Sequence, residues 1–248
     1  MDFNIRVADR HILIHSVYPQ IYSKCELYRT GDIATPELEI RTDETMIRNE
    51  IKWIKVAPGT VLDPTDAEKL LVQRLLAEEL LSFDTLLMHG AVVAVDNVAY
   101  LFTANSGIGK TTHVLNWLKH IDSAYVVNGD KPFIIVREDS ELPLACGSPW
   151  AGKENLQTNT IVPLKAIVLL ERAEENQIER ISFGQAFPFL LQQVYRPGNE
   201  EKMRKTLRLM QRMSPAVSFW RFQCNNFKDD CFEVAYRTLV GGREEDER

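Results

Sequence analysis

One short segment, residues 104–112, holds the side chains most able to do chemistry in this chain of 248 residues. It contains two glycines, a lysine and two threonines between an expected strand and an expected helix. Glycines let successive backbone N–H groups face one anion, and a helix N-terminus adds a favourable dipole. In such a loop the lysine contacts the β- and γ-phosphates of a nucleotide, and the hydroxyl after it coordinates Mg²⁺. We call residues 104–112 the phosphate loop and expect its binding residues to be Asn105, Ser106, Gly107, Ile108, Gly109, Lys110, Thr111 and Thr112.

The phosphate loop departs from the usual pattern at its first position. The pattern is Gly-x-x-x-x-Gly-Lys-Ser/Thr, and Ala104 stands where the first glycine would be. Alanine tolerates positive φ less readily than glycine, so the loop must begin with an ordinary backbone angle. An incidental Gly-Lys-Thr at a helix start is the alternative interpretation, but the flanking elements favour a nucleotide site. The motif does not distinguish ATP from GTP.

The elements around the phosphate loop predict an α/β fold with mixed α+β character. Strand alternates with helix along this part of the chain, an order that places ligands at the carboxyl ends of strands. From hydrophobic pattern and turn residues we expect strands at 91–95, 98–103, 124–127, 133–136 and 161–170, and a helix at 111–120.

The two ends of the chain have different characters. Residues 1–62 are expected to be β-rich, with strands at 12–14, 38–41 and 51–56 and two adjacent antiparallel strands within 37–56. Asp63 as N-cap and Pro64 at the first helical position predict a helix that ends near Phe83. Residues 182–239 are expected to be mainly helical, with breaks at 196–199 and near 214–215. Residues 241–248 are too polar to pack and are expected to be disordered.

Composition and charge narrow the class of protein. Hydrophobic residues make up 45% and charged residues 26%, which is typical of a globular protein, and the net charge is −6. That balance predicts neither nucleic acid nor an anionic membrane as a partner. The four cysteines form no metal-binding pattern, and reduced thiols are the simpler interpretation. No signal peptide and no apolar run of about 18 residues is found, so a cytoplasmic protein is expected.

Several short blocks around the phosphate loop together resemble a known nucleotide-binding core. The chain carries His89-Gly90 before the first strand and Asn128-Gly129-Asp130 after the loop's helix. This ordered set resembles the core shared by HPr kinase/phosphorylase and phosphoenolpyruvate carboxykinase. It is most similar to bacterial HPr-kinase-related proteins, with further likeness at 147–155, 162–167 and 195–197. The strong part covers about residues 86–170. The first 60 residues do not resemble the N-terminal domain of HPr kinase, and that enzyme's glutamate-arginine-glycine signature is missing.

The resemblance implies roles for residues outside the phosphate loop. It makes Asp130 the candidate general base and, with Thr111, a candidate metal ligand, and it places His89 beside the metal and the γ-phosphate. Both families usually have two adjacent aspartates here, whereas this chain has Asp130 followed by Lys131. Glu154 is then a candidate for the second acid. Taken alone, such an aspartate is a common turn residue and such a histidine a common core residue. Candidate substrate contacts are Lys153, Glu154 and Arg196.

The resemblance also implies an organisation and a reaction. It implies an HPr kinase-like nucleotide-binding catalytic domain at 63–240 with C-terminal helices, while the residue pattern predicts the β-rich subdomain at 1–62 and the tail at 241–248. We expect an ATP- and Mg²⁺-dependent kinase whose acceptor is a hydroxyl of a protein, peptide or small molecule, serine foremost. The sequence does not determine the oligomeric state, and the analogy with HPr kinase relatives allows a homo-oligomer.

Two other functions remain open at this point. A non-catalytic nucleotide-binding regulatory module would explain Ala104 and Lys131, since each removes a feature that active relatives usually keep. A carboxykinase-type enzyme would need arginines for a small dianionic acid. Arginines are available for it, although no motif ties them to a site: Arg172, Arg180 and Arg196.

Overall fold

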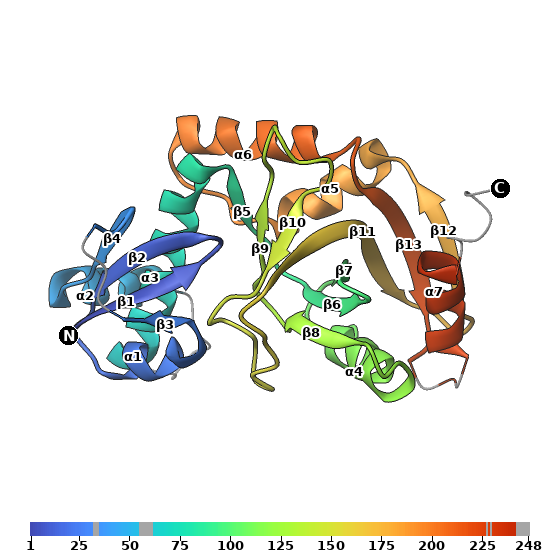
Figure 1. Cartoon of the computed structure of the whole chain (residues 1–248), viewed down its shortest axis with the longest axis horizontal. Coiled ribbons are helices and arrows are strands. Elements are labelled where there is room, and N and C mark those ends of the chain that lie inside the picture. Colours follow the sequence, from blue (N-terminus) through green and yellow to red (C-terminus); the bar gives the residue numbers. More distant parts are fainter. Residues whose placement is uncertain (32–34, 55–61, 227, 229, 242–248) are drawn as a thin grey trace.

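The computed structural model describes residues 1–31, 35–54, 62–226, 228 and 230–241. Its strands form two sheets, a four-stranded sheet near the N-terminus and a nine-stranded sheet in the rest of the chain (Figure 1). Helices pack against both sheets. The architecture is therefore mixed α/β, in agreement with the fold class predicted from the sequence.

The small sheet is built on an antiparallel hairpin. Ala8 and Asp9 both have positive φ, at 51° and 62°, and turn β1 back onto β2. β4 then pairs parallel to β2, and the sheet order is β3-β1-β2-β4. Alternate residues such as Ile12 and Ile14 are fully buried, as a half-buried strand requires. The elements are β1 (Asp2–Val7), β2 (Arg10–His15), α1 (Gln20–Lys24), η1 (Glu26–Tyr28), β3 (Arg29–Thr30) and β4 (Leu38–Arg41).

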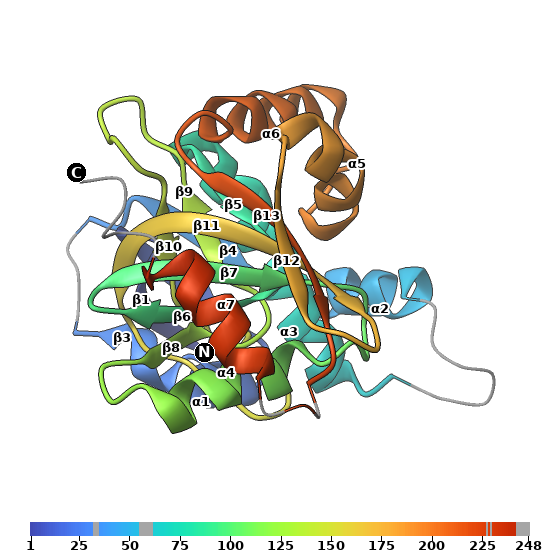
Figure 2. The same cartoon turned by 90° about the vertical axis from the view of Figure 1, so that its right-hand side faces the viewer.

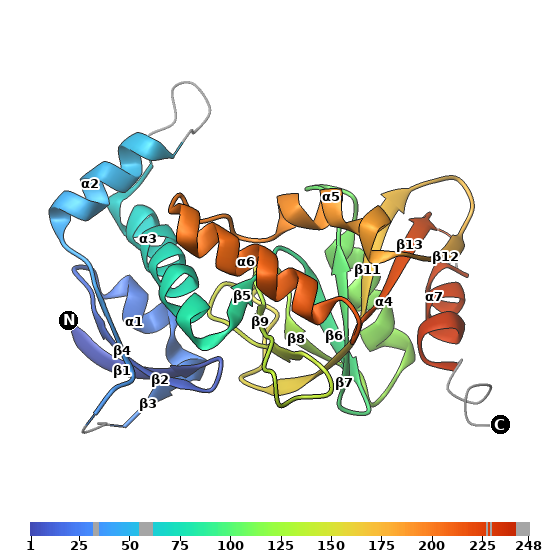
Figure 3. The same cartoon turned by 90° about the horizontal axis from the view of Figure 1, so that it is seen from above.

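The prediction of a strand at 51–56 is wrong for its described part. Residues up to Trp53 belong to a helix, α2 (Glu44–Trp53), and 55–56 lie outside the described residues. The Asp43 carboxylate caps this helix by accepting from the Thr45 and Met46 amides, at 2.7 and 2.8 Å. Ile47 of α2 packs with Ala67 and Leu71 of α3, and Figure 3 shows the two helices next to each other. Capping and tertiary contact thus outweigh the β-branched residues that favoured a strand.

The helix predicted from Asp63 is confirmed. α3 (Pro64–Glu79) starts with the Asp63 carboxylate accepting from the Thr65 amide at 2.8 Å, and it runs into η2 (Leu80–Phe83). Val72 and Leu76 of α3 join a core that contains both the small sheet and strands of the large sheet. α3 therefore links the two sheets.

The large sheet has a long central strand, β11, with parallel neighbours. β7 and β13 both run parallel to β11, and β10 pairs antiparallel with its first residues. The sheet order is β5-β9-β10-β11-β7-β6-β8, with β13 beside β11 and β12 beside β13. Its strands are β5 (Thr85–Leu87), β6 (Ala91–Val95), β7 (Val98–Thr103), β8 (Tyr125–Asn128), β9 (Phe133–Ile135), β10 (Leu144–Cys146), β11 (Ile161–Arg172), β12 (Gln177–Ile181) and β13 (Ser218–Cys224). The strands predicted at 91–95, 98–103, 124–127, 133–136 and 161–170 are confirmed.

Helices cover both faces of the large sheet. Because strand residues alternate in direction, Leu101 of β7 packs into one core, while Tyr100 and Phe102 pack into another. The first core is closed by α5 and α6 and the second by α4 and α7, as Figure 2 shows. These helices are α4 (Lys110–His120), α5 (Phe183–Gln193), α6 (Glu200–Met213) and α7 (Cys231–Leu239).

The prediction that 182–239 is mainly helical needs one correction. The three helices and the breaks at 196–199 and 214–215 are found, but β13 lies between α6 and α7. Phe219, Phe222 and Cys224 of β13 are buried, and the strand lies between β11 and β12. A seven-residue buried strand between two helices is easily taken for a helical segment, since its apolar residues fit either period. Of the tail predicted at 241–248, all but residue 241 lies outside the described residues.

The structure also describes the cysteines and the length of the helices. All four cysteines are buried and free. None of the helices in the described part of the chain is both long and apolar enough to cross a membrane.

Candidate functional site

The phosphate loop connects β7 to the first turn of α4, as the sequence predicts. Gly107 and Gly109 have φ of +82° and +110°, which side chains other than glycine rarely adopt. Gly109 is the N-cap of α4, so the free amides of that helix open towards the loop. A Cβ at Gly109 would lie 2.4 Å from Nδ2 of Asn226, so that side chain would have to move.

Ala104 fits the loop without strain. Its side chain is fully buried, and it is not among the described residues with positive φ. The expectation that the loop begins with an ordinary backbone angle is therefore confirmed, and replacing the usual glycine causes no strain here.

Lys110 lies folded back over the phosphate loop. Its Nζ donates to the carbonyl of Ala104 at 3.0 Å and to that of Asn105 at 3.5 Å. The pKa of Lys110 is lowered, mainly because the side chain is partly buried. The charge of Asp130 opposes this shift, and the charge of Lys131 adds to it. A partly desolvated lysine beside free amides is an arrangement that a polyphosphate would stabilise.

Asp130 is held at the end of β8 by a buried asparagine. The side-chain oxygen of Asn128 accepts from the Asp130 and Lys131 amides, at 2.9 and 2.7 Å. The Asn128 Nδ2 donates to the Ser148 carbonyl at 2.9 Å, and the Ser148 hydroxyl donates to the Lys131 carbonyl at 2.6 Å. Sequence reasoning missed both supporting residues. An asparagine two residues before the aspartate is the usual signal of such a turn, and it could have been found.

His89 meets the Asp130 carboxylate across the site. Nε2 of His89 lies 3.3 Å from Oδ1 of Asp130, and Nδ1 lies 2.8 Å from Oε1 of Gln193. The backbone joins the same two segments, since the Gly90 amide donates to the Asp130 carbonyl at 2.9 Å. Gln193, from the end of α5, is a further positioning residue that the sequence pattern did not reveal. The structure thus brings together His89 and Asp130, which are far apart in the chain.

The charge state of Asp130 follows from its neighbours. Burial raises the pKa of this carboxyl, but the hydrogen bond from His89 and the positive charges of Lys131, His89 and Lys110 outweigh it. The pKa is therefore below its ordinary value of 3.8, and the carboxylate is ionised at neutral pH.

The loop at 152–157 passes beside Asp130 at Gly152. A Cβ placed on Gly152, whose φ is +79°, would lie 3.3 Å from Cβ of Asp130 and 3.6 Å from Oε2 of Glu154. Lys153, Glu154 and Arg196 are all exposed, and none of them has a hydrogen bond or ion pair with the other described residues. All three therefore stay candidates for contact with a substrate.

The oxygen atoms at the site suit Mg²⁺. Magnesium is usually bound by one or two carboxylates together with nucleotide phosphates, water and a loop hydroxyl. Thr111 lies in the first turn of α4, and its hydroxyl makes no hydrogen bond with the described residues. Within the described ranges no group of three or more His, Cys, Asp and Glu could hold a metal by itself. A hard cation would therefore be held by Thr111, Asp130 and the phosphates it accompanies.

A hollow of about 360 Å³ opens on the outer side of the phosphate loop. The loop glycines, Ile108 and Thr112 form one wall, and the ends of β11 and β13 form the other. Arg172 donates to the Gly107 carbonyl at 2.9 Å and fixes the two walls together. The size of this hollow falls within the range of small-molecule sites.

Comparison with known proteins adds little to this geometry. No protein-family model matches the chain, and no curated protein matches it. Among solved structures, the HPr(Ser) kinase/phosphatase from Coxiella burnetii aligns with a TM-score of 0.37 and 11% identity. That alignment covers 65% of this chain and 99% of the other. At this similarity it assigns neither a reaction nor a partner to this chain.

Proposed function

We propose that this chain is an ATP- and Mg²⁺-dependent kinase that transfers the γ-phosphoryl group to a hydroxyl. The observation that carries the proposal is the meeting of two segments. The ionised Asp130 lies within electrostatic reach of Lys110, whose loop presents the free amides of α4. A phosphate donor and a proton acceptor would therefore share one site.

The donor side is supported by the phosphate loop and the hollow beside it. The amides at the start of α4 and the Lys110 ammonium would hold the β- and γ-phosphates. The hollow next to Thr112 is lined in part by the apolar residues Ile108 and Ala173, which suits a nucleoside. When bound at Thr111 and Asp130, Mg²⁺ would neutralise charge on the phosphates.

On the acceptor side, Asp130 would act as the general base. The hydroxyl proton would move to the Asp130 carboxylate as the hydroxyl oxygen bonds to the γ-phosphorus. The bond from that phosphorus to the bridging oxygen would break, and ADP would leave with the electron pair. His89 would hold the carboxylate through its Nε2 contact, and Gln193 would hold the ring. A base with a low pKa suffices, because phosphoryl transfer depends mainly on positioning and charge stabilisation.

A nucleotide-binding regulatory module is the second candidate function, and Lys131 favours it. This lysine is half-buried directly after Asp130, and its charge acts on both Asp130 and Lys110. It stands where the sequence resemblance leads us to expect a carboxylate. A protein that only senses ATP would need the phosphate loop but no free base.

Two measurements on the same variants separate the two functions. ATP binding is measured by calorimetry, and transfer is measured with γ-labelled ATP, Mg²⁺ and a set of hydroxyl compounds. Lys110→Ala should weaken ATP binding by about tenfold to a hundredfold, since it removes a charge-assisted contact. Asp130→Asn should bind ATP almost normally but slow transfer by about a hundredfold or more. Lys119→Ala, an exposed lysine at the far end of α4, is the matched control.

Two results would contradict the proposal. If Lys110→Ala bound ATP as well as the unaltered protein, the phosphate loop would not be the nucleotide site. If the unaltered protein bound ATP but transferred nothing to any hydroxyl, the regulatory function would stand instead.

A further inference from the structure

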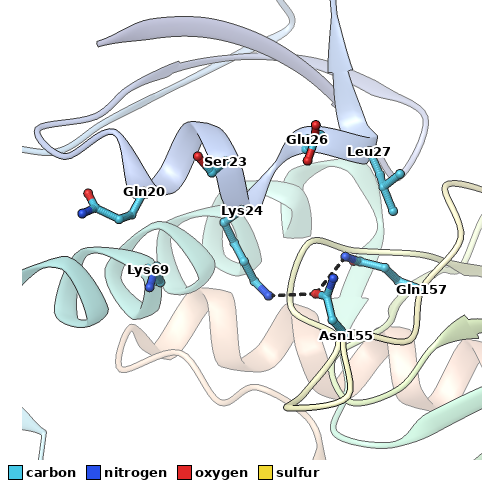
Figure 4. Close-up of a pocket in the computed structure, with 8 residues that line it drawn as sticks. All are labelled: Gln20, Ser23, Lys24, Glu26, Leu27, Lys69, Asn155 and Gln157. Atoms are coloured by element: carbon cyan, nitrogen blue, oxygen red, sulfur yellow. Dashed lines mark hydrogen bonds between the residues drawn. The ribbon is translucent and has the colours of Figure 1, made fainter.

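A second hollow, of about 350 Å³, lies where the small sheet's helices meet the loop at 152–157 (Figure 4). Ser23 and Lys24 come from α1, Lys69 from α3, and Asn155 and Gln157 from the loop. The Lys24 side chain points across the hollow, and its Nζ donates to Oδ1 of Asn155 at 3.3 Å. Residues of α1, η1 and α3 therefore form one wall of the hollow, and Asn155 and Gln157 of the loop form the other.

The hollow contains the ammonium group of Lys24, which forms no ion pair with the other described residues. Its side-chain hydrogen bond goes to a neutral amide. Lys69 is paired with Asp66 at 2.8 Å, and Glu26 lies 3.5 Å from Arg29. Burial and the charge of Lys69 lower the pKa of Lys24, while Cys25 and Asp130 raise it. An anion in the hollow would supply the missing partner.

The loop that lines the hollow also contacts the segment that carries Asp130. Besides Asn155 it contains Gly152, where a Cβ would lie 3.3 Å from Cβ of Asp130. The Gly129 amide, next to Asp130 in the chain, donates to the carbonyl of residue 156 in the same loop at 2.9 Å. The charges of Lys24 and Asp130 act on one another. A ligand held by Lys24 would therefore lie within electrostatic reach of Asp130.

We propose that this hollow binds the anionic group of the phosphoryl acceptor, which is a small hydroxy compound that carries a carboxylate or phosphate. Lys24 would bind the anion, the Asn155 and Gln157 amides would orient it, and the hydroxyl would face Asp130. The volume lies at the lower end of the range for small-molecule sites, which favours a small molecule over the surface of a folded protein. The inference rests on the kinase function proposed above and gives α1 of the N-terminal segment a role, acceptor selection.

Direct binding tests this inference without any transfer reaction. Calorimetric titrations at low salt would use glycerate as the carboxylate probe, glycerol phosphate as the phosphate probe and glycerol as their neutral counterpart. Each is run with and without saturating MgADP, so that a probe bound at the phosphate loop is recognised by displacement. At least one anion should bind the unaltered protein, and Lys24→Gln should weaken it about tenfold or more. Lys24→Arg should retain most of the affinity, and Lys52→Gln, an exposed lysine of α2, should have no effect.

The outcomes separate this inference from the kinase proposal. If neither anion binds better than glycerol, or if Lys24→Gln binds the anion as well as the unaltered protein, the acceptor site is overturned. MgATP binding, measured on the same protein, is unaffected by that result and decides the kinase proposal separately. Urea unfolding is measured on Lys24→Gln as a control. We expect this variant to be folded, because the Lys24 side chain is only half-buried.

Discussion

The helix that carries the phosphate loop contains a buried histidine, His113, whose ionisation should control stability in acid. The Trp117 Nε1–H donates to Nε2 of His113 at 3.1 Å, so this nitrogen is an acceptor in the folded protein. The ring also packs against Phe102 and Phe222, with centroids 4.6 and 5.4 Å away. Burial lowers the pKa of His113 from its ordinary value of 6.5 to about 4, although a hydrogen bond with Asn226 opposes the shift.

The size and sign of the effect follow from the two pKa values. The unfolded chain takes up a proton below pH 6.5, whereas the folded chain does not until about pH 4, so acid favours unfolding in this window. Stability from His113 is therefore complete above pH 6.5 and is lost as the pH falls. At about 1.4 kcal/mol per pH unit the full loss is about 3 kcal/mol, of which about 2 kcal/mol should be lost between pH 7.5 and pH 5.

Urea unfolding at pH 7.5 and pH 5 measures this contribution. Protonation of carboxylates also changes stability between these pH values. Because all variants have the same carboxylates, this contribution cancels when the losses of the variants are compared. The unaltered protein should lose about 2 kcal/mol more than His113→Gln between the two pH values. His120→Gln, an exposed residue of the same helix, should lose as much as the unaltered protein. Equal losses in His113→Gln and the unaltered protein would refute the reasoning.

Three further predictions concern the backbone around the site and the contact of α3 with residues 17, 18 and 42. Asn128→Ala removes the acceptor that holds the Asp130 turn, so urea stability should fall by about 2 kcal/mol and transfer should slow. Gly109→Ala, at φ +110°, should weaken ATP binding about tenfold by calorimetry, whereas Gly198→Ala, with nothing within 4 Å of its Cβ, should not. Glu68→Ala leaves two main-chain amides and one hydroxyl without their buried acceptor, so it should cost about 3 kcal/mol in urea, and a loss under about 1 kcal/mol would contradict this.

Local chemistry explains which elements were foreseen. The strand, loop and helix around Lys110 are encoded within a few residues, because glycines at positive φ and a helix start are short-range requirements. The start of α3 was equally clear, since Asp63 and Pro64 act on the first turn only. The strand β13 was missed because its burial depends on β11, which lies about fifty residues earlier.

The sequence indicated which residues belong to the candidate site but not how they contact one another. The phosphate loop, His89 and Asp130 could each be named from motif and resemblance. Their contacts were not, because His89 meets Asp130 and Gln193 only after strands distant in sequence pair in one sheet. Lys24 comes near Asp130 only because α3 packs the small sheet against the large one. Neighbouring residues determine backbone features such as a helix start or a glycine turn. The burial of each acid, its charge state and its hydrogen-bond partners depend on packing between distant segments.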